Sequence, residues 1–416
     1  MTLLSITSIL ITVSALFAWL NYRTLKLPTT IGIMVISLLF SLLLVVLGAL
    51  GFEAGQNMAE NLVAQIDFNK ALLHGMLGFL LFAGAMHVNL DDLLEAKWVI
   101  GLLASVGLFV STALVGVGTY LILKLVGIEL SFAYCLLFGA LISPTDPVAV
   151  MGILKTAGVS KKLETKITGE SLFNDGVAIV VFLAIFGIAV NGDAVDFGNI
   201  GMLFLQEAIG GALFGFVCGF IVLQMLKHVD NYQVEVLLTL ALVAGGTTAA
   251  TSLHLSAPIA VVVAGLMIGN SGRSNAMSDT TVEHLDTFWE LIDEILNAVL
   301  FLLIGLEIMV MSSDPRVWIV GVVLAVVVLL ARLTAVSIPV NMMRLSNNFH
   351  PHIVKILTWG GLRGGISVAL ALSIPAGPER DIVVTITYVI VVLSILLQGL
   401  TINKLVKATR QENPPA

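Results

Sequence analysis

Charged residues are scarce in this chain of 416 residues. Only 11% are Asp, Glu, Lys or Arg, whereas 58% are hydrophobic, and the mean hydropathy is +1.04. Because a soluble domain usually carries about 25% charged residues, this composition excludes an ordinary water-exposed globular domain. It is typical of a protein whose solvent is a lipid bilayer, since the hydrocarbon core favours apolar side chains.

Several other features are missing as well. The two cysteines, Cys135 and Cys218, lie within apolar runs and are too few for a disulfide framework or a zinc site. No GxxxxGK[ST] phosphate loop and no basic patch occur, which argues against ATP-driven transport and against nucleic-acid binding. We therefore expect no cofactor, no nucleotide and no nucleic-acid partner. Residues 1–20 lack a charged leading segment, so they predict a first spanning helix rather than a cleaved signal peptide.

Long apolar runs fill most of the chain. A membrane-spanning helix needs about 20 mostly apolar residues. With that window, the sequence predicts an all-α, multi-pass membrane protein of about thirteen helices forming one transmembrane domain, followed by a short cytoplasmic tail at 407–416. The predicted spans are 2–20, 28–50, 70–89, 98–124, 131–154, 167–190, 200–226, 232–253, 256–271, 291–312, 316–343, 352–376 and 381–406.

The distribution of positive charge supports this topology. With the N-terminus outside, fourteen of the 20 Lys and Arg residues fall in inside segments and four in outside segments. That bias follows the positive-inside rule, so we expect a protein of the cell (inner) membrane whose C-terminus is cytoplasmic. Thirteen spans suggest two six-helix halves around a linker helix, which would make the halves inverted repeats, a common transporter plan.

One predicted span is interrupted by prolines. The segment Leu141–Val150 reads LISPTDPVAV, in which Pro144 and Pro147 bracket Thr145 and Asp146. Each proline removes a backbone N–H and clashes with the preceding turn, so we expect a local break within the membrane. Backbone groups freed at that depth are tolerated where they line a cavity, and broken helix ends suit ion sites. We interpret Asp146 as a cap that also lines the ion path; a cap alone is the alternative.

A cluster of polar residues begins the next span. The segment GESLFNDG at 169–176 contains Glu170, Ser171, Asn174 and Asp175. The spacing of four places Glu170 with Asn174, and Ser171 with Asp175, on one helix face. Ionisable groups at membrane depth are costly and therefore indicate function. A carboxylate among oxygen neighbours can hold either H⁺ or Na⁺, which is the simplest physical basis of antiport. The alternative is an acidic helix N-terminus favoured by the helix dipole.

Two arginines fall within predicted spans. Arg332, in LLARLTAV, is too central to reach the membrane surface easily and needs a buried anion, for which Glu170 and Asp146 are candidates and Glu170 is preferred. Arg363 lies in WGGLRGGIS, whose glycines weaken a helix and predict a second interrupted span. If the halves are inverted repeats, Asp146 and Arg363 cap opposed half-helix ends. A simple charge at the cytoplasmic edge is the alternative for Arg363.

These motifs resemble those of the NhaP/NHE group of monovalent cation/proton antiporters. The resemblance covers nearly the whole chain and is most specific in SPTDPVAV, in GESLFNDGVAIV and in GGLRGGIS. It implies a thirteen-helix fold of two inverted six-helix repeats, with a core domain, a dimerisation domain and crossed, discontinuous fifth and twelfth helices. It also implies a homodimer that is not an enzyme and that exchanges Na⁺ or Li⁺ for H⁺ by alternating access.

The resemblance also assigns site residues. It implies that H⁺ and Na⁺ compete for Asp175, and that Ser171 and Thr145 help to ligate the metal ion. Asn174 occupies the position where electrogenic relatives carry a second Asp, which implies electroneutral 1:1 exchange. The candidate ion-binding residues are Thr145, Asp146, Ser171, Asn174 and Asp175. The implied structural pairs are Glu170 with Arg332, and Asp146 with Arg363 as the groups that stabilise the crossed helices.

One position departs from the family pattern. Many relatives carry an acidic residue after the phenylalanine of the third helix, whereas Ala83 follows Phe82 in this chain, with His87 one turn further on. K⁺/H⁺ exchange by the same fold is therefore the main alternative, because the candidate ligands are all oxygens. A cation channel is a further alternative. It would need a continuous ring of pore-lining groups, whereas the polar groups here come from interrupted helices of one chain. An intramembrane hydrolase using Asp146 and Asp175 is disfavoured by the nearby arginines.

Overall fold

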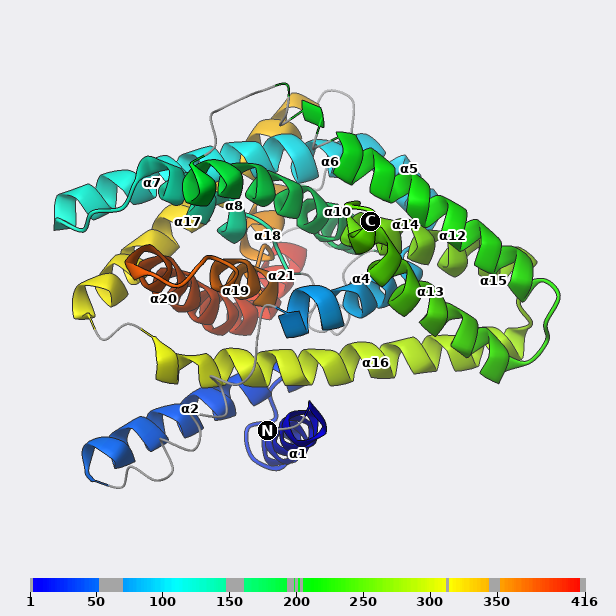
Figure 1. The fold of residues 1–416 in the computed structure, drawn as a ribbon, viewed down its shortest axis with the longest axis horizontal. Helices are drawn as coiled ribbons and strands as arrows, with labels where there is room; N and C mark the ends of the chain where they lie inside the picture. The colour runs from blue at the N-terminus through cyan, green and yellow to red at the C-terminus, as the bar shows by residue number, and fades with distance from the viewer. Residues whose placement is uncertain are drawn as a thin grey trace.

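The structure, a computed structural model, describes residues 3–51, 70–146, 161–192, 198, 201–202, 205–311, 314–343 and 352–411. Every secondary-structure element in these ranges is a helix (Figure 1), so the all-α prediction is confirmed. Pro147, the second proline of the predicted break, lies outside the described residues.

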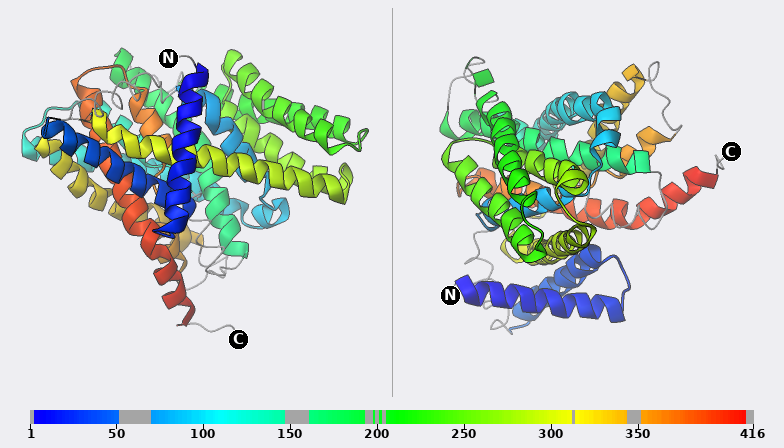
Figure 2. Two further views of the ribbon diagram at one scale, coloured as in Figure 1. Left: turned by 90° about the horizontal axis from the view of Figure 1, so that it is seen from below. Right: turned by 90° about the vertical axis from the view of Figure 1, so that its right-hand side faces the viewer.

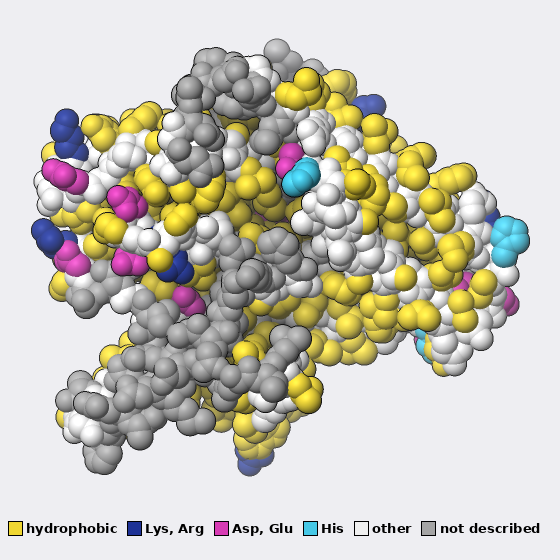
Figure 3. All heavy atoms as spheres, viewed as in Figure 1, with side chains coloured by type: hydrophobic (Ala, Val, Ile, Leu, Met, Phe, Trp, Pro, Cys, Tyr) yellow, Lys and Arg dark blue, Asp and Glu magenta, His cyan; other side chains and the backbone are white. Residues whose placement is uncertain are grey.

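Apolar helices dominate the described part of the chain. Eight of its helices are long and apolar enough to cross a membrane. In the view of Figure 3, hydrophobic side chains cover a broad surface, and a group of Lys, Arg, Asp and Glu side chains lies at its left edge. This distribution supports a multi-pass membrane protein, whereas the count of thirteen spans and the inverted repeats stay predictions.

The N-terminal helices lie against one long helix. α1 (Leu3–Arg23) and α2 (Thr29–Ala49) pack on α16 (Asp279–Leu306), with α1 outermost (Figure 2). Two serines of α2 fasten it to α16, because Ser37 Oγ donates to the Leu302 carbonyl at 2.8 Å and Ser41 Oγ donates to the Gly305 carbonyl at 3.0 Å. Small polar residues of this kind join membrane helices closely. α16 begins twelve residues before the predicted span 291–312. The acidic residues Glu283, Asp286 and Glu290, which precede that span, are therefore part of the same helix.

A second group of helices packs through glycines. It contains α4 (Leu77–Met86), α12 (Gly211–Leu226), α13 (Tyr232–Ser252) and α14 (Ala257–Met267). A Cβ at Gly215 would lie 2.1 Å from the Ala260 carbonyl oxygen, and one at Gly265 would lie 2.9 Å from that of Phe82. Only a glycine allows α12 and α14, and likewise α14 and α4, to approach so closely.

The third group surrounds the polar motifs. α7 (Leu108–Val126), α8 (Phe132–Ile142), α10 (Lys161–Phe186), α17 (Pro315–Met343) and α20 (Pro378–Leu393) pack together with α18 and α19. α6 (Lys97–Leu102) continues through a π-helical segment, Leu103–Gly107, into α7. The remaining elements are η1 (Lys70–Met76), α5 (Leu90–Glu95), η3 (Gly187–Asn191), η4 (Leu205–Gly210), η5 (Ile268–Gly272), α15 (Arg273–Asn275), η6 (Glu307–Val310), η7 (Ser394–Gly399) and α21 (Leu400–Gln411).

Two helix breaks meet at the centre of this group. α8 ends at Ile142, and α18 (Ile353–Trp359) is separated from α19 (Gly365–Leu372) by a non-helical segment. The two breaks touch, because the Asp146 backbone N–H donates to the Leu362 carbonyl at 2.8 Å. The interruption predicted at the glycine-rich segment is thus present. Backbone groups at this depth bond to one another or to buried side chains, as a membrane interior requires.

Candidate ion-binding site

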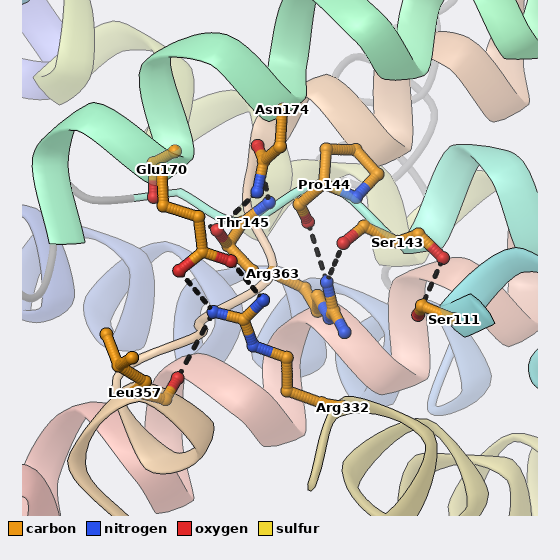
Figure 4. A network of polar contacts seen from close by, with 10 residues as sticks. Ser111, Ser143, Pro144, Thr145, Glu170, Asn174, Arg332, Leu357 and Arg363 are labelled. Carbon is orange, nitrogen blue, oxygen red and sulfur yellow. Dashed lines mark hydrogen bonds and ion pairs between the residues drawn. The ribbon is translucent and has the colours of Figure 1, made fainter. Parts of the chain in front are cut away.

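Arg363 caps the C-terminal end of α8. Its side chain is buried, with 2% exposure, and its Nη1 donates to the carbonyl oxygens of Ser143 and Pro144, the latter at 2.8 Å (Figure 4). These carbonyls follow the last turn of α8 and have no partner within that helix. A helix C-terminus carries partial negative charge, so the guanidinium satisfies the orphan carbonyls and also stabilises the end electrostatically.

Asp146 lies at the start of α19. A Cβ built at Gly364, the residue that precedes this helix, would lie 2.0 Å from Asp146 Oδ2. A helix N-terminus carries partial positive charge and favours a carboxylate. Asp146 and Arg363 therefore lie at opposed half-helix ends, each next to the end whose partial charge is opposite to its own. The role of these two residues in stabilising the crossed helices stays a prediction.

Glu170 and Arg332 form a buried ion pair between α10 and α17. Nη1 of Arg332 donates to Oε1 of Glu170, and Nη2 donates to Oε2 at 2.9 Å (Figure 4). Nη2 also donates to the Leu357 carbonyl of α18 at 3.2 Å. The exposure is 1% for Glu170 and 6% for Arg332, so each charge depends on the other. Of the two candidate partners for Arg332, the structure pairs it with Glu170.

Three neutral polar side chains meet beside this pair. Thr145 Oγ1 and Ser171 Oγ are 3.0 Å apart, and Asn174 Nδ2 donates to Thr145 Oγ1 at 2.9 Å. The Thr145 backbone N–H also approaches Asn174 Oδ1, at 3.4 Å. All three residues are 2% exposed. The structure therefore brings the segment after α8 and the polar residues of α10 together.

Asp175 follows Asn174 on α10 and differs from its neighbours. It is 3% exposed, yet it forms no hydrogen bond or ion pair with any other residue that the structure describes. The nearby carboxylate of Asp146 repels it electrostatically. A buried bare carboxylate with no partner is expensive, so this site favours a bound proton or a bound cation.

The chemistry of the group suits a hard monovalent cation. The hydroxyl and amide groups of Thr145, Ser171 and Asn174 lie within hydrogen-bond distance of one another, and the carboxylate of Asp175 follows Asn174 on α10. Oxygens of these types bind alkali and alkaline-earth ions rather than transition metals. Within the described ranges, no cluster of three His, Cys, Asp or Glu residues could hold a metal ion. A cation bound by these oxygens would be a transported substrate, not a resident cofactor.

Some supporting residues were not identified from the sequence. Ser394 Oγ accepts from the Arg363 backbone N–H at 3.1 Å and donates to Gln398 Oε1 at 2.5 Å, and Ser143 Oγ donates to Ser111 Oγ at 2.8 Å. These bonds connect the crossing to η7 and α7. The sequence signal that could have identified these serines is a polar residue within an apolar run. Asn297 of α16 shows the same signal: it is 1% exposed, and its amide has no hydrogen-bond partner among the described residues.

The third-helix position that departs from the family pattern is also buried. Ala83 of α4 is 1% exposed, and its carbonyl oxygen lies 2.8 Å from Nδ1 of His87. His87 itself is exposed and caps the C-terminal end of α4. Ala83 supplies no side-chain oxygen, so α4 adds no ligand at this position.

Comparisons with known proteins show which family the chain is similar to. The family model described as "Sodium/hydrogen exchanger, transmembrane" matches residues 11–408. The Na⁺/H⁺ antiporter NhaP of Pseudomonas aeruginosa is 50% identical over 412 residues, which cover 97% of this chain and 96% of that protein. The Na⁺/H⁺ antiporter NhaH of Halobacillus dabanensis is 36% identical over 357 residues, covering 84% of this chain and 86% of that protein.

A solved structure shares the fold. The sodium proton antiporter MjNhaP1 from Methanocaldococcus jannaschii at pH 8 superimposes with a TM-score of 0.74, over 98% of this chain and 99% of that chain. The two sequences are 18% identical, so this similarity concerns the fold alone.

Proposed function

The chain belongs to the sodium/hydrogen exchanger family, and we propose that it is a secondary active antiporter that exchanges Na⁺ or Li⁺ for H⁺. The observation that carries the proposal is the carboxylate of Asp175, which is buried and forms no hydrogen bond or ion pair with another described residue. It directly follows Asn174, a member of the hydrogen-bonded group of Thr145, Ser171 and Asn174. The names of the relatives, Na⁺/H⁺ antiporters from Pseudomonas and Halobacillus, support the choice of substrates.

The proposed exchange rests on competition for one carboxylate. With a proton bound, Asp175 is neutral and can remain buried without a cation. When Na⁺ binds, the proton must leave, because the cation needs the anionic oxygen and the site cannot hold both charges. Ser171 and Thr145 then supply further oxygens to the ion, and Asn174 orients the Thr145 hydroxyl. Because neither bound form leaves a bare charge, both can cross between the two sides of the membrane.

A ratio of one proton to one cation follows from the other charges of the site. Glu170 is neutralised by Arg332 within the chain, and Asn174 carries no charge. Asp146 lies against the N-terminal end of α19 and interacts with its partial positive charge. Asp175 is then the single carboxylate available to the transported ions, so exchange is electroneutral.

Alternating access is assigned to the crossing of the broken helices. Short half-helices joined by non-helical backbone can shift as a unit while their ends stay capped by Asp146 and Arg363. We place the protein in the cell membrane as a homodimer, with the N-terminus outside and the C-terminus in the cytoplasm. The charge bias along the chain supports that orientation.

Purified protein in proteoliposomes tests the proposal. A pH change inside the vesicles on addition of Na⁺ or Li⁺, lost in Asp175→Asn, is the expected result. A response to K⁺ alone would keep the mechanism and replace the substrate, an outcome that the missing acidic residue at Ala83 makes worth measuring. No response to any of the three cations would contradict antiport.

A further inference from the structure

An apolar cavity lies on the outer side of α18, away from the ion site. It has a volume of about 500 Å³, within the usual range of ligand sites, and lies between α17, α18 and α21. Its walls include the exposed side chains of Leu330 and Leu333, so it opens on the surface of α17. α17 is one of the helices long and apolar enough to span a membrane, so we expect the opening to face lipid.

Polar groups are placed at one end of this cavity. Lys355 is exposed and lines the cavity, and Trp359 Nε1 donates to Thr401 Oγ1 at 2.8 Å, which ties α18 to α21. Lys404 follows Thr401 by three residues on α21, so the two share a helix face, and Lys404 is exposed. Two cations therefore lie near an apolar groove whose rim also carries a tryptophan, a residue typical of the membrane interface.

One lining residue lacks a partner. Thr358 is 6% exposed and lines the cavity, but its Oγ1 forms no hydrogen bond. A buried hydroxyl normally finds a hydrogen-bond partner, because leaving it unsatisfied is costly. A molecule that carries an oxygen acceptor beside an apolar chain would satisfy Thr358 and fill the groove at the same time.

From these observations we propose that the cavity binds an anionic phospholipid. One acyl chain lies in the apolar groove of α17 and α21, an ester oxygen accepts from Thr358, and the phosphate pairs with Lys355 and Lys404. The positive-inside topology puts both lysines on the cytoplasmic side, whose leaflet carries anionic lipids, and basic pockets between membrane helices on that side bind such headgroups. This site is separate from the proposed exchange chemistry and does not depend on it.

Occupation of the cavity would act on the ion site through α18. Leu357, which accepts from Arg332, directly precedes Thr358. A lipid that fills the groove holds α18 against α17, and therefore holds the carbonyl that orients the Glu170–Arg332 pair. We expect a bound lipid to raise the thermal stability of the protein.

Delipidated protein in detergent tests the site. Phosphatidylglycerol and phosphatidylcholine with identical acyl chains are titrated, with native mass spectrometry for binding and thermal unfolding for stability. Phosphatidylglycerol should bind more tightly and raise the unfolding temperature more. Equal binding of the two lipids would overturn the proposal, and so would the same stabilisation by inorganic phosphate, which would mean that the apolar groove is not used.

Two variants and a matched control locate the binding. Lys355→Gln should weaken phosphatidylglycerol binding about fivefold, the factor that corresponds to about 1 kcal/mol for one basic side chain at a membrane surface. Leu333→Trp, which fills the groove, should remove binding of both lipids at this site. Lys227→Gln changes an exposed lysine that directly follows α12, on the same predicted side of the membrane, and should have no effect. Equal loss in Lys227→Gln and Lys355→Gln would indicate general surface attraction and contradict the site.

Discussion

Two regions of α10 each bury a carboxylate, and their surroundings differ. Around Glu170, the guanidinium of Arg332 makes two hydrogen bonds to the carboxylate and a third to the Leu357 carbonyl. Around Asp175, five residues further along the same helix, no described side chain forms an ion pair, and the carboxylate of Asp146 repels it electrostatically.

The two carboxylates differ in how their charge is neutralised. Glu170 is neutralised by a cation that belongs to the chain, so its charge is fixed and it joins α10 to α17. Asp175 has no such cation, and its charge must be balanced by an ion from solution. Two acidic residues on one helix thus have different surroundings: Arg332 pairs with Glu170, whereas no described basic residue forms an ion pair with Asp175. We propose different roles for them on this basis.

The largest effect is expected from Asp175→Asn. The amide has nearly the same size and is tolerated in a buried polar site, but it neither ionises nor balances a cation. Exchange with Na⁺ and Li⁺ should be lost completely while size-exclusion elution and unfolding temperature stay close to wild type. Preserved exchange in the variant would place the shared carboxylate elsewhere and remove the distinction between the two regions.

Removal of Arg332 should instead damage stability. Arg332→Ala leaves Glu170 as an uncompensated buried charge, which costs about 3 kcal/mol or more. The double variant Arg332→Ala/Glu170→Ala should be more stable than Arg332→Ala, because no charge is stranded. Thermal unfolding in detergent measures both. If the two variants lose the same stability, the ion pair does not have the structural role assigned to it.

A smaller effect is expected from the hydroxyl of Thr145. Thr145→Val keeps the shape and removes the group that bonds to Ser171 and Asn174, so the apparent KM for Na⁺ should rise about tenfold, as expected for one hydrogen-bonding ligand left unmet. Thr112→Val is the matched control, since Thr112 is also buried but its hydroxyl has no partner. An equal change of KM in both variants would contradict a ligand role for Thr145.

Membrane voltage should have no effect if Asp175 alone serves the transported ions. A potassium diffusion potential imposed with valinomycin across proteoliposomes should drive no net movement of Na⁺ in the absence of a pH gradient. Uptake that follows the sign of the potential would mean that a second charge moves with the ions, and Glu170 or Asp146 would have to be reconsidered as its carrier.

The smallest effect is expected at an exposed ion pair. Hydrogen bonds from the Arg316 side chain hold the pKa of Asp314 below its usual range, and the contact from Arg316 Nη2 to Asp314 Oδ2 is 2.8 Å. The pair's contribution to stability is present above the ordinary Asp pKa of about 3.9 and is lost only as pH falls through the lower folded value. Asp314→Asn should therefore leave the pH dependence of exchange near neutrality unchanged. A shifted profile would mean that groups outside α10 share control of the proton.

The all-α, multi-pass fold could be predicted from the sequence, because hydrophobicity and positive charge can be read directly along the chain. The break at the glycines around Arg363 followed from backbone preferences of those residues. The residues alone left Glu170 and Asp146 as partners for Arg332, with Glu170 preferred, and the resemblance implied Glu170; the choice depends on how α17 packs against α10. The support of Arg363 by Ser394 was not foreseen either, since it joins residues 31 positions apart through tertiary contact.

Neither the full length of α16 nor the cavity beside α18 could be predicted from the sequence. The predicted span begins at residue 291, after several acidic residues, whereas the helix is continuous from Asp279. A cavity is a property of packing among three helices, and no local pattern in Thr358 or Leu333 indicates it.

The dependence of Na⁺ exchange on pH tests competition at Asp175 most directly. Initial rates of Na⁺ exchange are measured over a range of Na⁺ concentrations at several pH values, with the same pH on both sides of the proteoliposome membrane. Competition predicts that the apparent KM for Na⁺ rises about tenfold for each unit of pH on the acidic side, while the maximal rate stays constant, because H⁺ and Na⁺ exclude one another from one group. A KM that is independent of pH, with a maximal rate that falls instead, would contradict a shared carboxylate.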